Sequence, residues 1–217
     1  MADAVIFDLD GVLMDSERLW NEAKEALVRD AGGHWRDEAS RAMLGMSSPE
    51  WAAYLRDELG VRMEPEAISR DVVRRMEEGY RRRLPLLPGA AEAVRATAAR
   101  WPLGLASSSN RAIIDLVLQL AGFAGCFRVT VSSEEVARGK PAPDVYLAAA
   151  RGLGVDPAGC VAIEDSGNGI RSAAAAGMTV IAVPNREYGP DEEALSLAAA
   201  RVAVVGEVTV ELVERVG

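Results

Sequence analysis

Short, almost wholly apolar runs recur along the chain and constrain its fold more than any other feature. Six are visible, at residues 4–9, 102–107, 127–132, 160–165, 178–183 and 201–205. Every interval between them, except the long one after the first run, holds a helical pattern or a short turn. Strands that are apolar on both faces and separated by helices are typical of a parallel sheet covered on both sides. The sequence therefore predicts an α/β fold with a doubly wound, Rossmann-like parallel sheet and helices at 89–100, 110–121, 143–153 and 168–176.

The long interval after the first run has a different character. It contains no convincing strand and is dense in charged residues at helical spacing. Ser16 can cap a first helix that presents Trp20 on its apolar face. Further helices are expected at 36–44, 48–59 and 65–83. The sequence thus predicts two domains, an α/β core formed by 1–14 and 86–217 and an all-helical cap at 15–85 inserted after the first strand.

Composition and charge limit the partners of the chain. With 49% hydrophobic and 26% charged residues among 217, it has the ordinary balance of a globular protein. The formal net charge of −9 argues against nucleic acid and anionic membranes as partners, because both are negatively charged. No run approaches the length of a membrane span, and the N-terminus carries no export signal. We therefore expect a cytoplasmic protein, and we expect it to act as a monomer.

Three scarce residue types narrow the chemistry. His34 is the only histidine, so reactions that need a histidine base or a cluster of histidine ligands are nearly excluded. Cys126 and Cys160 are far apart in the sequence and indicate neither a disulfide framework nor a thiolate metal site. Of 24 lysines and arginines, only Lys24 and Lys140 are lysine. Because the other 22 of these cations are arginine, the two lysines carry more weight than usual.

Polar side chains follow four of the apolar runs, at the strand ends where ligands bind in open parallel sheets. They are Asp8 and Asp10 after the first run, Ser107–Ser109 after the second, Lys140 shortly after the third, and Glu164 and Asp165 after the fourth. Taken singly, each group has a plain structural interpretation as a turn residue, a helix cap or a solvated cation. Their coincidence at the ends of core strands favours one common site.

Carboxylates gathered at one sheet edge need a cation between them, since like charges a few ångströms apart repel strongly at low dielectric. Ligation by oxygen alone suits Mg²⁺. A phosphoryl group beside that ion would be bound by Lys140 and by the Ser107 hydroxyl with nearby amides. Asp8 is then the candidate nucleophile that forms an aspartyl phosphate. Asp10 is the candidate acid and base, which protonates the leaving oxygen and later deprotonates the hydrolytic water.

Four segments resemble, in order and spacing, the motifs of the haloacid-dehalogenase-like hydrolase superfamily, in the branch with a helical cap after the first strand. They are DLDGVLMDSE (8–17), LASSSN (105–110), GKPAPDVY (139–146) and EDSGNGI (164–170). The resemblance extends along essentially the whole chain. It implies Mg²⁺-dependent phosphoryl transfer with Asp8 as nucleophile, Asp10 as acid and base, and Ser107 and Lys140 as phosphate ligands. It also implies a metal bound by Asp8, Asp165 with Glu164, and the backbone carbonyl of Asp10.

Within this branch the sequence resembles β-phosphoglucomutase and sugar-phosphate phosphatases. The family's mutases hold a second phosphate partly with a cap histidine and a cap arginine, whose positions are matched here by Trp20 and Ser48. Both departures favour a phosphatase that hydrolyses a small phosphorylated metabolite, such as a sugar or polyol phosphate. Haloacid dehalogenases proper lack a second aspartate at the position of Asp10, so a dehalogenase is disfavoured. Two alternatives stay open, a β-phosphoglucomutase-type phosphotransferase and a non-enzymatic phospho-accepting receiver-like module.

Substrate contacts are expected from both domains. The predicted set comprises Ser107, Ser108, Asn110 and Lys140 in the core, and Trp20, Gly45 and Ser47 in the cap. Trp20 has an equally plain interpretation as a packing residue, and the segment around Gly45 and Ser47 as a turn between helices. The basic run Arg81–Arg83 is interpreted as a solvated helix face.

Overall fold

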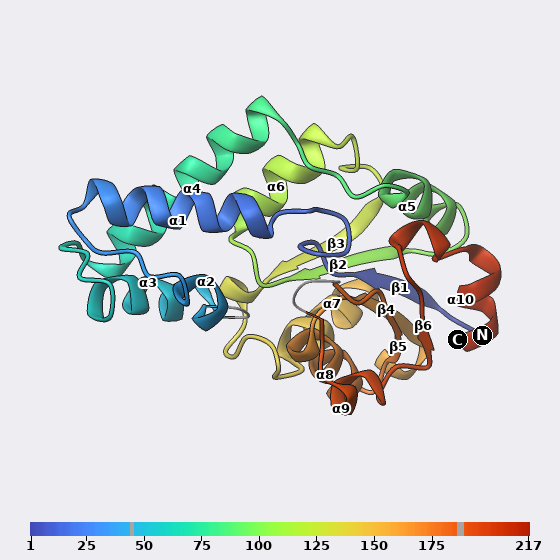
Figure 1. The fold of residues 1–217 in the computed structure, drawn as a ribbon. Helices are drawn as coiled ribbons and strands as arrows, with labels where there is room; N and C mark the ends of the chain where they lie inside the picture. Colours follow the sequence, from blue (N-terminus) through green and yellow to red (C-terminus); the bar gives the residue numbers. More distant parts are fainter. Residues whose placement is uncertain (44–45, 186–188) are drawn as a thin grey trace. The chain divides into compact units, whose positions relative to one another are not determined.

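The computed structural model describes residues 1–43, 46–185 and 189–217, and within them a six-stranded parallel sheet organises the chain (Figure 1). The strands are β1 (Ala4–Phe7), β2 (Leu103–Ser107), β3 (Phe127–Ser132), β4 (Cys160–Glu164), β5 (Thr179–Ala182) and β6 (Ala200–Arg201). Their order in the sheet is β3-β2-β1-β4-β5-β6, with every neighbouring pair parallel. The predicted doubly wound α/β fold is confirmed.

The central strands explain why their sequences are continuously apolar. Every residue of β1, β2 and β4 is buried, because helices lie on both faces of the sheet (Figure 1). On one face, Ile6 belongs to a core cluster that includes Tyr146 of α7 and Ile170 of α8. On the other, the ring of Phe7 packs edge-on against Phe127 at 6.2 Å between centroids.

Among the described residues, six α-helices accompany the sheet. They are α5 (Ala90–Ala98), α6 (Arg111–Leu120), α7 (Asp144–Leu153), α8 (Gly167–Ala175), α9 (Glu192–Leu195) and α10 (Val210–Val216). Three short 3₁₀ turns, Ser133–Glu135, Pro157–Gly159 and Val205–Glu207, complete the connections. Four of the α-helices match the sequence-based predictions to within two residues at each end.

The prediction of a strand at 201–205 is wrong over most of that range. Only Ala200–Arg201 pairs with β5, and the chain then leaves the sheet and forms the 3₁₀ turn Val205–Glu207. Val205 and Val208 are buried, whereas Val204 is 44% exposed. An apolar run this short at a sheet edge has only one neighbouring strand to pair with, so the burial of Val205 and Val208 decides the path of the chain instead.

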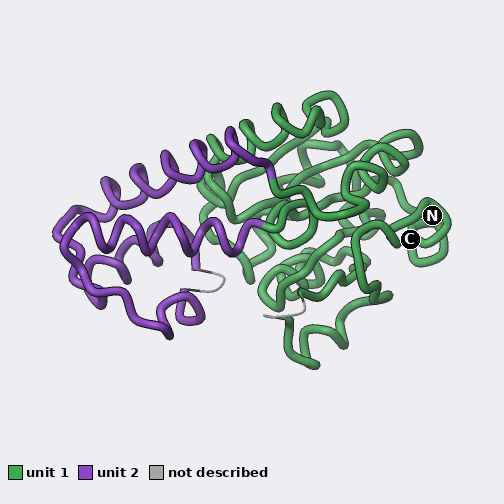
Figure 2. Tube along the Cα trace, turned by 45° about the horizontal axis from the view of Figure 1, so that its top comes forward, with its two compact units in different colours: residues 1–15, 85–217 green, residues 16–84 purple. Residues whose placement is uncertain are grey.

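The chain divides into two compact units, Met1–Asp15 with Pro85–Gly217, and Ser16–Leu84 (Figure 2). The described residues of the second unit form the helices α1 (Glu17–Asp30), α2 (Ala39–Ala42), α3 (Ser48–Asp57) and α4 (Pro65–Arg82). The two chain crossings between the units lie side by side, since the Asp15 N–H donates to the Pro85 carbonyl at 2.8 Å. The role of the second unit as a cap stays a prediction.

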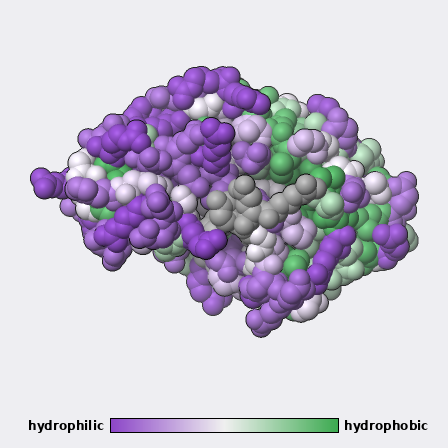
Figure 3. All heavy atoms as spheres, viewed as in Figure 1, coloured by the Kyte–Doolittle hydropathy of each residue, from purple (hydrophilic) through white to green (hydrophobic). Residues whose placement is uncertain are grey.

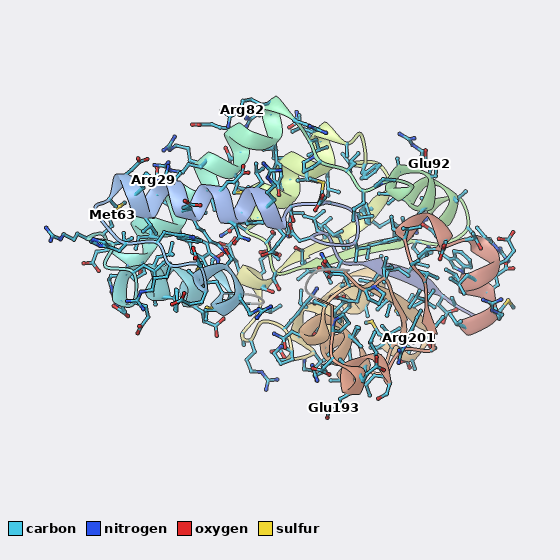
Figure 4. All side chains as sticks on the ribbon, in the orientation of Figure 1. Arg29, Met63, Arg82, Glu92, Glu193 and Arg201 are labelled. Carbon is cyan, nitrogen blue, oxygen red and sulfur yellow. The ribbon has the colours of Figure 1, made fainter. Side chains whose placement is uncertain are left out.

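On the face shown in Figure 3, hydrophilic residues dominate the second unit. Arg82 is exposed and points away from α4 in Figure 4, as expected for a solvated helix face.

Ser16 occupies the N-cap position of α1, but its side chain makes no capping hydrogen bond. Among the described helices of both units, none is long and apolar enough to cross a membrane.

Candidate active site

The carboxyl ends of β1, β2 and β4 bring the predicted residues to one edge of the sheet. The strand order reverses between β1 and β4, and ligands of doubly wound sheets bind at such a reversal. Phe7 is in register with Leu105 of β2 and Ile163 of β4. Asp8, one residue further, therefore lies level with Glu164 on the neighbouring strand.

Three carboxylates form a tight group at this edge. Asp8, Glu164 and Asp165 each offer an oxygen, and these oxygens all lie within 4.8 Å of one another. Asp8 is 5% exposed and Glu164 is fully buried. Loss of solvation, with the negative charges of Glu164 and Asp10, raises the pKa of Asp8 to about 8 although Lys140 opposes the shift. Loss of solvation and the charges of Glu164, Asp8 and Asp10 raise the pKa of Asp165 well above its usual range, although Lys140 opposes the shift.

Lys140 joins the nucleophile candidate to this group. Its Nζ donates to Asp8 Oδ1 at 2.6 Å, to Glu164 Oε1 at 2.5 Å and to the Ala106 carbonyl at 3.0 Å. Its side chain is only 5% exposed. Burial alone would lower the pKa of Lys140, but the charges of Asp8 and Glu164 outweigh it and raise the pKa above its ordinary value. The ammonium therefore stays protonated, and the structure places Lys140 at the carboxyl ends of β1, β2 and β4.

Glu164 already has donors on both carboxylate oxygens. Oε1 accepts from Lys140 and from the Tyr146 hydroxyl at 2.8 Å. Oε2 accepts from the N–H of Asp165 at 3.0 Å and from the N–H and hydroxyl of Ser166 at 3.3 and 3.2 Å. Glu164 thus orients the lysine and the turn into α8. Tyr146 was not identified from the sequence, although it ends the segment GKPAPDVY.

Two glycines allow the backbone to approach these carboxylates. Gly11 has a φ of +81°, and a β-carbon there would lie 1.9 Å from Asp165 Oδ2. A β-carbon at Gly169 would lie 1.9 Å from the Glu164 carboxyl group. Larger residues would collide at both positions, so the glycines of the DLDG and EDSGNG segments have a steric reason.

The three serines after β2 have different environments. Ser107 is fully buried, and its Oγ accepts the Ser109 N–H at 3.0 Å. Ser108 is half-buried. Ser109 donates from its hydroxyl to Asp10 Oδ2 at 2.6 Å, a contact that sequence reasoning missed. Only the run of three serines could have drawn attention to it, because Ser109 and Asp10 are 99 positions apart.

Asn110, a predicted substrate contact, lies next to these serines and is hydrogen-bonded to another residue of this chain. Its Nδ2 donates to Glu134 Oε1 at 2.6 Å, and the N–H of Arg111 donates to Glu134 Oε2 at 2.8 Å. Asn110 is 6% exposed. Glu134 therefore stabilises the first turn of α6 through both residues, and a contact between Asn110 and substrate stays a prediction.

The predicted cap residues lie in the second unit. Trp20 is half-buried, and its ring centroid is 6.2 Å from that of Trp51. The Lys24 ammonium lies 5.6 Å from the Trp20 ring and 5.3 Å from the Trp51 ring, in a cation–π arrangement. The Ser47 N–H and hydroxyl donate to Glu50 at 2.7 and 2.6 Å, at the start of α3. Gly45 falls outside the described residues.

Comparisons with known proteins agree on one family. A family model described as haloacid dehalogenase-like hydrolase matches residues 2–177. Hexitol phosphatase B from Escherichia coli (strain K12) is 37% identical over 194 residues, which cover 87% of this chain and 86% of that protein. The bifunctional riboflavin kinase/FMN phosphatase from Arabidopsis thaliana is 32% identical over 187 residues, but these span 85% of this chain and only 49% of that longer protein.

A solved structure gives the same result. The crystal structure of a CbbY mutant from Rhodobacter sphaeroides in complex with xylulose-(1,5)bisphosphate superposes with a TM-score of 0.86. The two chains are 28% identical, and the match covers 95% of this chain and 96% of that one.

Proposed function

The chain belongs to the haloacid dehalogenase-like hydrolases and is a phosphoric monoester hydrolase, and we propose that it is a Mg²⁺-dependent phosphatase that forms an aspartyl phosphate on Asp8. The family membership confirms the resemblance inferred from the sequence. The observation that carries the proposal is the direct contact of Lys140 with Asp8 inside a group of three carboxylates. A buried carboxylate can receive a phosphoryl group, and the protonated lysine next to it can neutralise negative charge on that group.

The residues at this edge fit a magnesium ion. Asp8 and Asp165 would bind it by their side chains and Asp10 by its backbone carbonyl, and all of these are hard oxygen donors. Burial, together with neighbouring negative charge, raises the pKa values of Asp8 and Asp165, and a bound cation would oppose both shifts. Glu164, whose oxygens already accept from protein donors, would support the metal from the next layer through water. When bound, Mg²⁺ supplies positive charge for the carboxylates and for the phosphoryl oxygens.

Phosphate recognition falls to the groups that follow β2 and to Lys140. Because the Ser107 oxygen accepts the Ser109 N–H, the Ser107 hydroxyl proton can be donated to a phosphoryl oxygen. Ser108 lies next to it with greater exposure. Lys140 contributes the ammonium charge. These groups would bind the three peripheral oxygens and leave phosphorus open to attack by Asp8.

Two half-reactions complete the cycle. In the first, an Asp8 oxygen bonds to phosphorus, the ester P–O bond breaks, and Asp10 gives its proton to the leaving oxygen. In the second, water attacks the acyl phosphate, Asp10 takes a proton from that water, and inorganic phosphate leaves as the Asp8 carboxylate is restored. One carboxylate thus acts as nucleophile and the other as acid and base.

The substrate class follows from the relatives. Hexitol phosphatase B and the xylulose bisphosphate complex of CbbY both favour a sugar or polyol phosphate. We assign to the helical unit the role of a cap that contacts the sugar part, through Trp20, Ser47 and Gly45. Such a cap would exclude water from the phosphate and open to release product.

The experiment is a phosphate-release assay on a panel of sugar and polyol phosphates, with Mg²⁺ and with EDTA. We expect turnover only with Mg²⁺, and none for Asp8→Asn, which removes the nucleophile but keeps the shape. Mass spectrometry of quenched reactions should find one phosphoryl group on the Asp8 peptide. Retained turnover in Asp8→Asn would refute the nucleophile. A single stoichiometric phosphorylation without turnover would support a receiver-like module, and interconversion of a hexose 1-phosphate without phosphate release would support a mutase.

A further inference from the structure

Ser109 contacts the acid and base of the proposed reaction from a neighbouring strand end. Its hydroxyl lies 2.6 Å from Asp10 Oδ2. We propose that Ser109 is a positioning residue that orients the Asp10 carboxyl group toward the oxygen of the leaving group. The inference rests on the proposed phosphatase function, in which Asp10 transfers protons.

The backbone of Ser109 is fixed on both sides. Its N–H donates to Ser107 Oγ at 3.0 Å, and its carbonyl accepts from the Ser132 hydroxyl at 2.7 Å. Ser107 and Ser132 are the last residues of β2 and β3 and are in register with each other. Ser109 itself is 5% exposed, and both of its anchors are fully buried. The hydroxyl therefore has a position set by two core strands, although it belongs to a loop.

The Asp10 side of this contact is a turn. It lies beyond the end of β1 and is half-buried, in the turn that Gly11 makes at a φ of +81°. Rotation about its two side-chain torsions would move the carboxyl group relative to the substrate. The Ser109 hydroxyl restricts that rotation through its hydrogen bond to Oδ2. A displacement of about 1 Å at such a group is enough to slow a reaction by two orders of magnitude.

A hydroxyl is suited to this role because it is uncharged and can donate to Asp10 in both of its protonation states. It donates to Oδ2 of the ionised carboxylate that the second half-reaction needs, and it can equally donate to Oδ2 of the protonated carboxyl group, whose acid proton is then on the oxygen that faces the leaving group. A positively charged ammonium in the same place would favour the ionised state. Ser109 can hold Asp10 in both without changing its own position.

The test uses the dependence of Ser109→Ala on the leaving group. A general acid matters for an alkoxide leaving group and hardly for p-nitrophenolate, which leaves without a proton. We would measure kcat/KM, which reports the step that phosphorylates Asp8, with glycerol 3-phosphate, phenyl phosphate and p-nitrophenyl phosphate. General acids contribute about 10²–10⁴-fold, so we expect a loss of about tenfold or more with glycerol 3-phosphate and less than about twofold with p-nitrophenyl phosphate. Equal losses on all three would overturn the inference.

Three further variants keep the result interpretable. Ser109→Thr retains the hydroxyl and should restore the wild-type ratio of glycerol 3-phosphate to p-nitrophenyl phosphate activity. A ratio as low as that of Ser109→Ala would contradict the role of the hydroxyl. Ser109→Ala should add nothing to Asp10→Asn with glycerol 3-phosphate, and additive losses would also overturn the inference. Ser196→Ala, at an exposed serine that donates to the Glu193 carbonyl, is the matched control and should leave all ratios unchanged.

Failure of the inference and failure of the proposed function give different results. If the wild-type protein with Mg²⁺ turns over neither these three phosphates nor any member of the panel of sugar and polyol phosphates, or if Asp8→Asn stays active, the proposed function fails and the inference falls with it. If the wild type is active and Asp8→Asn is not, but Ser109→Ala shows no leaving-group dependence, the phosphatase stands and only the role of Ser109 is refuted.

Discussion

The hydroxyl of Tyr146 gives the most direct test of how this site is built. It donates to Glu164 Oε1 at 2.8 Å, and both side chains are fully buried. Burial and the Glu164 charge raise the pKa of Tyr146 well above its ordinary value, so the hydroxyl stays protonated as a donor. Tyr146→Phe removes this one donor and leaves the ring, over which the Lys140 ammonium lies at 5.1 Å from the centroid.

The magnitude follows from the remaining partners of Glu164. Hydrogen bonds to charged groups contribute about 1.5–3 kcal/mol to the free energy of unfolding. Glu164 keeps its contacts with Lys140, Asp165 and Ser166, so its carboxylate is not left without donors. We therefore expect a loss near the lower limit, about 1.5 kcal/mol. In a chain of this size that corresponds to a fall in Tm of roughly 3–6 °C.

Thermal unfolding followed by circular dichroism would measure this effect. Tyr54→Phe, at a half-buried tyrosine of α3, is the matched control and should change Tm by less than about 2 °C. We also expect kcat/KM to fall several-fold. Glu164 accepts a hydrogen bond from Lys140, and without the Tyr146 hydroxyl it would position Lys140 less firmly. An unchanged Tm together with unchanged kinetics would refute the reasoning, since it would mean that Tyr146 only fills space.

Three other predictions follow from the same contacts. Lys140→Ala should lower kcat and raise KM, with a combined loss of about 10²–10³ in kcat/KM as for a single transition-state donor, and steady-state kinetics that match the wild type would exclude its role. Gly11→Ala would place a β-carbon 1.9 Å from Asp165 Oδ2, so calorimetric titration should find weaker Mg²⁺ binding; unaltered affinity would show that the turn adapts. Folding raises the pKa of Asp8 from 3.8 to about 8. Between these pH values the folded state holds a proton that the unfolded state has released. Asp8 therefore makes the metal-free protein less stable as the pH rises. Mg²⁺ competes with that proton, and it should therefore raise Tm more at about pH 8 than at about pH 6; the reverse order in melting curves would contradict the assignment of Asp8 as a ligand.

The sequence was sufficient for most of the secondary structure because that information is local. The strand predicted at 127–132 forms at Phe127–Ser132, and the helix predicted at 143–153 forms at Asp144–Leu153. The prediction of a strand at 201–205 was wrong because a short apolar segment at a sheet edge is equally compatible with burial outside the sheet. The face of α1 also differed, since Lys24 is 7% exposed where an apolar stripe was expected. Two indole rings accept its ammonium, and helical periodicity alone does not reveal such a pair.

By itself, the sequence determined the type of fold and the carboxylates, serines and lysine that terminate or follow its core strands. Parallel strands place their carboxyl ends at one edge whatever their order, so Asp8, Glu164 and Lys140 could be expected to gather there. Only the tertiary structure decided which atoms meet. β1 lies between β2 and β4, and this order brings Ser109 to Asp10 and Tyr146 to Glu164. Those contacts join residues far apart in the chain, and they depend on strand order and helix packing that no local pattern of residues contains.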